Sequence, residues 1–164
     1  MGAPEVWLRG AVPGYAAELQ PVVHALLQAR EDVAAAASLP PDQLEARAGR
    51  SASIGYHLRH LAGSLDRLCT YARGEALSAA QLTVLRAEAT SGGESAEQLV
   101  AAATAAIEAA LAQLRTTAAA SLDEARAVGR AQLPSTVRGL LFHAAEHTTR
   151  HVGQVLTLQR VLEP

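Results

Sequence analysis

Apolar residues recur at helical spacing in four long stretches of this sequence, and this pattern constrains the fold more than any other feature. The first stretch covers residues 15–37 and ends before two consecutive prolines, which cannot continue a helix. The second begins near Ser51 or Ser53, either of which is a good N-cap, and ends at Gly74. We therefore expect two long helices in the first half of the chain.

The second half of the chain predicts one short helix and two more long ones. Ser78 caps the short helix. Ser95, with a glutamine three residues later, fits a capping box and begins a long helix that continues to about residue 118. The last helix follows Pro134 and runs nearly to the end of the chain. Residues 121–134 show no regular period, so we expect them to loop along the other elements with negligible strand.

The composition agrees with packed helices. Hydrophobic residues make up 49% of the chain and aromatic residues only 3%, so the core must be built from Leu, Val and Ala, which favour helices over a sheet. The pattern predicts an all-α four-helix bundle with a short extra helix, in one domain over residues 1–164. A helical repeat array is the alternative, but the sequence has no repeating period.

The charges and the single cysteine restrict the expected partners. The net charge is −2, and the 14 positive residues, all Arg, are scattered without interleaved aromatics, so we expect no nucleic-acid binding. No apolar run approaches the roughly 18 residues that span a bilayer, and no signal peptide is recognisable, so we expect no membrane partner and a cytoplasmic location. Cys69 is the only cysteine, which excludes an intrachain disulfide. Because few charges cover the helix faces, we expect a homodimer.

Three histidines at four-residue intervals lie in the last predicted helix, in the segment "GLLFHAAEHTTRHVGQV". Positions four apart lie about 40° apart around a helix, so His147 and His151 can reach one metal ion. His143 and His151 are separated by about 12 Å of helix, so all three cannot easily bind one ion. We therefore expect His147 and His151 to bind a divalent metal with a ligand from another helix, and His143 not to bind it.

The second predicted helix offers that third ligand in "YHLRHLAG". His57 and His60 lie about 60° apart, so only one of them is expected to face the interior, and the spacing alone does not choose between them. Cys69 lies about 180° from His60 and should point away from the site. We interpret His24, in the first helix, as a surface histidine or a hydrogen-bonded core histidine.

Motifs around the histidines suggest catalytic groups. The metalloprotease pattern H-E-x-x-H fails, because Thr148 follows His147. The inverted pattern H-x-x-E-H matches "HAAEH", with Glu146 in the place of the base, but too few residues follow to supply its distal carboxylate ligand. Glu146 and His143 are therefore weak candidates for a base. Arg67 lies almost on the same stripe as His60 and could hold an anionic substrate group, or it could pair with a residue of its own helix or face solvent.

These motifs together resemble a known family. The segment "SIGYHLRHLAGSLDRL", followed near the C-terminus by "HAAEHTTRHVGQV", resembles the DinB/YfiT-like superfamily of metalloenzymes, and the resemblance spans nearly the whole chain. It implies an up-down-down-up four-helix bundle with a divalent metal between the helices. The metal ligands that it implies are His60, His147 and His151.

The resemblance also implies a chemistry. Members include thiol transferases that use low-molecular-weight thiols such as bacillithiol, and mycothiol-dependent isomerases. Three neutral imidazoles leave a divalent metal with open positions for water or a thiol, and Zn, Ni and Fe all suit imidazole. We therefore expect a bacillithiol-type thiol S-transferase or a hydrolase with a small-molecule substrate. The alternatives are a non-catalytic metal-binding or stress-related protein, and a structural bundle whose histidines only pack.

Overall fold

The computed structural model describes residues 4–90 and 92–163, and 69% of it is helix. Along the chain the elements are α1 (Gln20–Val33), α2 (Pro41–Glu45), α3 (Ile54–Ala72), α4 (Ala79–Ala87), α5 (Ala96–Thr116), β1 (Ala125–Val128), β2 (Leu133–Thr136) and α6 (Val137–Leu162). The first and last residues of the predicted domain, 1–3 and 164, and residue 91 lie outside the described residues.

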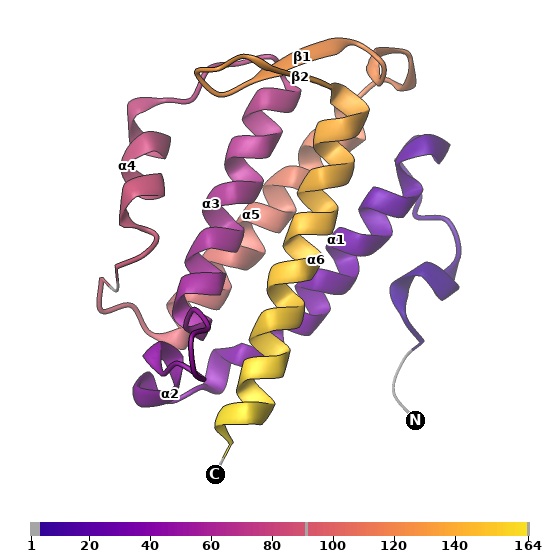
Figure 1. Cartoon of the computed structure of the whole chain (residues 1–164). Coiled ribbons are helices and arrows are strands. Elements are labelled where there is room, and N and C mark those ends of the chain that lie inside the picture. Colours follow the sequence, from indigo (N-terminus) through magenta and orange to yellow (C-terminus); the bar gives the residue numbers. More distant parts are fainter. Residues whose placement is uncertain (1–3, 91, 164) are drawn as a thin grey trace.

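The four long helices form a bundle in which each packs against two others (Figure 1). Helices α1 and α3 lie diagonally in the bundle, and both pack mainly against α5 and α6. Figure 1 shows α1 and α6 running in one direction and α3 and α5 in the other. The predicted up-down-down-up four-helix bundle is therefore confirmed.

Side-chain caps begin the helices where the sequence predicts them. The Ser53 side chain accepts from the backbone N–H of Tyr56 at the start of α3. Ser78 and Ser95 each form a full capping box at the starts of α4 and α5. The first long helix is shorter than predicted, because single turns of 3₁₀-helix, Ala17–Leu19 and Ala34–Ser38, flank α1 at both ends.

The segment before α6 differs from its prediction. Instead of an irregular loop, β1 and β2 form an antiparallel hairpin that covers one end of the bundle (Figure 1). Gly129 and Gln132 adopt positive φ angles in the connection, which lets the chain reverse. Each strand has only four residues, too few for an alternating pattern to be recognised in the sequence. The prediction of negligible strand was wrong for this segment. Its strands form because they pair with each other, and neither has an apolar pattern of its own that predicts a strand.

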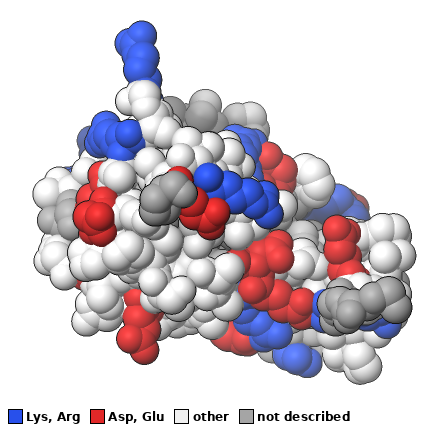
Figure 2. All heavy atoms as spheres, turned by 90° about the horizontal axis from the view of Figure 1, so that it is seen from below, with Lys and Arg blue, Asp and Glu red and all other residues white. Residues whose placement is uncertain are grey.

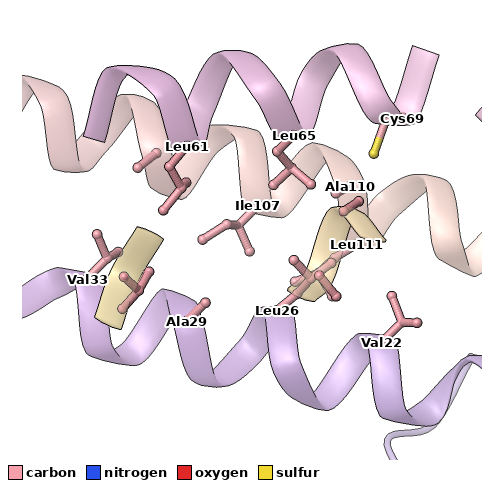
Figure 3. Close-up of a cluster of buried hydrophobic side chains, with 14 of the residues drawn as sticks. Val22, Leu26, Ala29, Val33, Leu61, Leu65, Cys69, Ile107, Ala110 and Leu111 are labelled. Atoms are coloured by element: carbon pink, nitrogen blue, oxygen red, sulfur yellow. The ribbon is translucent and has the colours of Figure 1, made fainter. Parts of the chain in front are cut away.

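Aliphatic side chains from all four long helices fill the core. Figure 3 shows Leu26 of α1, Leu65 of α3 and Ile107 of α5 pointing toward one another, and each is at most 1% exposed. Cys69 lies at the edge of the same cluster and is buried. The expected core of Leu, Val and Ala is present, and it holds the long helices at fixed positions.

The surfaces of α5 and of the whole bundle bear on the expectations that the protein binds neither a membrane nor a nucleic acid. By length and composition alone, α5 is apolar enough to cross a membrane, contrary to the expectation from the sequence that no apolar run approaches this length. Its exposed face is rich in alanine, while its larger apolar residues pack in the core, as in the core helix of a globular bundle. Figure 2 shows acidic and basic side chains interspersed on the face of the molecule seen from below.

We predict a large loss of stability when Leu65 is truncated to alanine. Leu65 is fully enclosed between α3 and the other long helices, so Leu65→Ala should lower the free energy of unfolding by about 2–5 kcal/mol. Leu85→Ala is the matched control, because Leu85 on α4 is 42% exposed, and it should change stability by about 0.5 kcal/mol or less. Urea unfolding of both variants checks this, and equal effects would contradict the described core.

Candidate metal site

The antiparallel contact between α3 and α6 brings together histidines that are about 90 residues apart in sequence. One imidazole nitrogen from each of His60, His147 and His151 lies within 4.8 Å of the other two. Among the described residues, these three form the one group of His, Cys, Asp or Glu side chains arranged closely enough to share a metal ion. All three rings are only partly buried, so solvent can reach them.

Two pairs of imidazoles face each other nitrogen to nitrogen across the helix interface. Nε2 of His60 lies 3.0 Å from Nε2 of His147. Nδ1 of His57 lies 2.8 Å from Nδ1 of His151. The rings of His147 and His151 are also neighbours, with centroids 4.5 Å apart. Four imidazoles, and not three, therefore meet between α3 and α6.

The expectation that only one of His57 and His60 faces the interior was wrong. Both side chains reach α6, His57 at His151 and His60 at His147. His57 is the more buried of the two, with 7% of its surface exposed. Its nitrogen contacts His151 and it stands outside the three-residue group, so it is a hydrogen-bonding partner of a candidate ligand.

A buried carboxylate lies behind His60. Oε2 of Glu88, the residue that follows α4, accepts a hydrogen bond from Nδ1 of His60 over 2.7 Å. Its other oxygen, Oε1, accepts from Nη1 of Arg67. Burial acts to raise the pKa of Glu88, but the hydrogen bonds from His60 and Arg67 and their charges outweigh it and lower the pKa. Glu88 is therefore an ionised, doubly bonded acceptor.

Arg67 has a structural position that neither reading of the sequence described. It is buried, with 8% of its surface exposed, and its guanidinium is paired with Glu88 instead of facing a cleft. An arginine in a buried pair needs its partner, since an unpaired buried charge is strongly destabilising. The geometry therefore gives Arg67 a role in holding Glu88 and not in holding a substrate anion.

His143 and Glu146 lie on the rim of the histidine cluster. The ring of His143 lies next to that of His147, with centroids 5.3 Å apart, but His143 is outside the three-residue group. The Glu146 carboxylate accepts from Nε of Arg150 over 2.9 Å, and this contact lowers its pKa. A carboxylate with a lowered pKa is a weak base, so His143 is the better candidate of the two.

Burial favours the neutral form of three of the clustered imidazoles, those of His57, His147 and His151. It is the largest cause that lowers the pKa of His57 and His147, and it lowers the pKa of His151 to about 3, with further repulsion from the neighbouring histidines and Arg150. Metal ligation requires the neutral form of imidazole. The metal-free protein thus already holds these rings in the protonation state that a metal ion needs.

The remaining predicted residues lie away from the site. Cys69 is in the core, where burial raises the pKa of its thiol to about 11, as expected for a thiol that is not a ligand. His24 has a hydrogen bond between its Nε2 and the carbonyl oxygen of Gly10 over 2.9 Å, so it ties the N-terminal segment to α1.

The residues present fit a divalent cation. Nitrogens bound to one metal ion at about 2.0–2.1 Å lie roughly 3–3.5 Å from each other, and the clustered nitrogens already approach this spacing. Nε2 of His147 faces Nε2 of His60 over 3.0 Å, so these two rings direct nitrogens toward each other as two ligands of one ion would. The donor set is three imidazoles, which suits Zn and other borderline metals.

Sequence reasoning missed Glu88 and the position of His57. The histidine pair in "YHLRH" was a usable signal for His57, because residues three apart can both border one helix contact. Glu88 had no comparable signal. It lies 28 residues from His60 on another element, and only the docking of α4 brings it to the site.

We predict that the metal-free protein loses stability as the pH falls below about 6.5. The unfolded chain protonates its histidines near pH 6.5, whereas the folded protein keeps His151 neutral down to about pH 3. The unfolded state then binds more protons, so stability decreases with falling pH. The thermal unfolding midpoint measured between pH 7 and pH 5, above the usual carboxylate range, should fall in the wild type and fall less in His151→Gln. His24→Gln is the control, and identical slopes for all three proteins would contradict the prediction.

The sequence model of the DinB superfamily matches residues 25–155, which is 131 of the 164 residues and includes all three clustered histidines. A search of the curated proteins finds no match. Because the matched region covers most of the chain, from α1 into α6, the protein belongs to the DinB superfamily.

Proposed function

We propose that this protein is a divalent-metal-dependent enzyme that joins a low-molecular-weight thiol of the bacillithiol type to an electrophilic small molecule. The observation that carries the proposal is the group formed by His60, His147 and His151, in which three protein nitrogens converge and no fourth protein ligand joins them within the described residues. A structural zinc site is closed by four protein ligands, whereas three ligands leave a position for a reactant. Hydrolysis by the same site is the second candidate.

The bound metal would lower the pKa of a thiol or a water molecule and so supply a nucleophile at neutral pH. In a thiol transfer, the sulfur forms a bond to an electrophilic carbon, the leaving group departs with its electron pair, and the thiol proton must pass to a base. His143 is exposed and lies beside His147, so we assign it the role of proton acceptor.

A non-catalytic metal-binding protein is the alternative, and the environment of the rings favours catalysis. The three histidines are only partly buried, so a small molecule can approach the open side of the group. A storage or structural site has no need of that access. The homodimer, the cytoplasmic location and the choice among Zn, Ni and Fe stay predictions.

We predict that protein purified without a histidine tag contains close to one divalent ion per chain. Alanine substitution of His60, His147 or His151 should each remove most of that metal, because two imidazoles hold an ion poorly. His143→Ala should retain most of it. Elemental analysis measures the content. A site emptied by His143→Ala but filled in His151→Ala would mean that the ligand set is displaced by one helical turn.

We predict thiol-dependent turnover of an aryl chloride such as a chlorodinitrobenzene, with bacillithiol as the thiol. The rate should be lost on removal of the metal and in His60→Ala, because both remove the metal that would lower the pKa of the thiol. His143→Ala should keep the metal but lower kcat about 100-fold or more, as expected for a lost base. His24→Ala is the control and should be fully active. Metal binding without turnover of either this substrate or an ester would support the non-catalytic alternative.

A further inference from the structure

Glu88 is a buried carboxylate that contacts the histidine cluster without belonging to it. It is 4% exposed, and its Oε2 lies 2.7 Å from Nδ1 of His60, on the side of the ring opposite His147. It cannot also reach the point where the three nitrogens converge, and it is not part of that group. Its contact with the site is therefore through His60 alone.

The hydrogen bonds of Glu88 fix the proton on His60. An ionised carboxylate only accepts hydrogen bonds, and here it accepts one from Arg67 and one from His60. Nδ1 of His60 must therefore carry the proton. In a neutral ring this leaves the lone pair on Nε2, the nitrogen that faces His147 and the centre of the cluster.

The fold reserves space for this carboxylate. A Cβ on residue 63 would collide with Oε1 of Glu88 and lie 2.8 Å from Nη1 of Arg67, so the glycine at this position of α3 permits the close approach. Nε of Arg59 also donates to the backbone carbonyl oxygen of Glu88 over 3.1 Å. Three side chains of α3 thus bind the single residue that follows α4.

Helix α4 itself has no buried residues, so apolar packing does not explain why it docks on α3. Its other anchor is polar: Nε2 of Gln81 donates to Asp66 over 2.8 Å and to Thr70 over 2.7 Å. Helix α4 is thus held on α3 mainly by hydrogen bonds, and its docking places the buried Glu88 carboxylate against His60. We infer that the docking of α4 serves the histidine site and not the apolar core.

We propose that Glu88 is a positioning residue that sets the tautomer and orientation of His60 and thereby determines the affinity of the three-histidine site for its metal. The proposal rests on the proposed function for the metal site, but not on whether the site is catalytic. Outer partners of this kind typically account for about 10–100-fold in metal affinity.

Glu88→Gln is the sharpest substitution, because it keeps the shape and removes the second acceptor. If the amide oxygen faces Arg67, its NH₂ group faces Nδ1 of His60 and favours a proton on Nε2, the tautomer that cannot ligate. If the amide oxygen faces His60, its NH₂ group faces the guanidinium of Arg67, and two donors then meet without an acceptor. Glu45→Gln is the matched control, since the Glu45 carboxylate of α2 accepts hydrogen bonds from two other side chains at α3, from Arg59 over 2.9 Å and from Ser53 over 2.9 Å.

The experiment measures Zn²⁺ affinity by competition with a chromophoric chelator and the His60 tautomer of the metal-free protein by ¹⁵N NMR of the imidazole. We expect Glu88→Gln to bind Zn²⁺ about 10–100-fold more weakly and to lose the Nδ1–H tautomer of His60. Glu45→Gln should stay within about twofold of the wild type, and circular dichroism should report folded protein in every case.

Two outcomes would contradict the positioning role of Glu88, and a third would contradict the proposed metal function. Affinity of Glu88→Gln within about twofold of the wild type overturns the positioning role, as does an Nε2–H tautomer of His60 in the wild type. The latter measurement needs no variant and so holds even if Glu88→Gln fails to fold. Absence of Zn²⁺ binding by the wild type, with Nδ1–H present on His60, overturns the proposed metal function and this proposal with it, while leaving the hydrogen bond itself established.

Discussion

The antiparallel packing of α3 against α6 is the constraint on which the rest of the structure depends. Because the helices run in opposite directions, His57 and His60 meet His151 and His147 in reversed order. A slide of one helix by a single turn, about 5.4 Å, would separate both pairs of facing nitrogens. The crossover through α4 and the hairpin before α6 give the two helices these directions (Figure 1). The bundle topology thus serves one local requirement, the convergence of imidazoles from two distant segments.

Imidazoles at a helix interface cost stability that the aliphatic core has to offset. Burial favours the neutral form of the His147 ring at the expense of its hydration, and Nδ1 of His147 and Oγ1 of Thr148 are buried without partners in the described structure. The neighbouring core compensates with fully enclosed side chains such as Leu58 and Leu61 on the same helix as His60. One face of α3 therefore packs in the apolar core, while another carries the histidines. The stability gained by the first face offsets what is lost at the second.

Much of the fold could be predicted from the sequence because its signals are local. Serine caps mark the starts of α3, α4 and α5, and the i, i+4 spacing places His147 and His151 on one face. The partner of His60 could not be predicted this way, since Glu88 is set by how α4 docks and not by any spacing within a helix. The hairpin was missed for a similar reason, because each of its short strands is defined only by the other.

The position of Cys69 bears on the source of the thiol. It is the only cysteine, it lies in the core between the long helices (Figure 3), and burial raises the pKa of its thiol to about 11, so almost none of it is thiolate at neutral pH. A thiolate close to three neutral imidazoles would occupy the open metal position itself and convert a reactive site into a closed one. Because Cys69 is buried in the core, the open position of a metal held by the three histidines would remain accessible to an external ligand. The thiol transfer proposed above would therefore take its sulfur from an external small molecule and not from the protein's own cysteine.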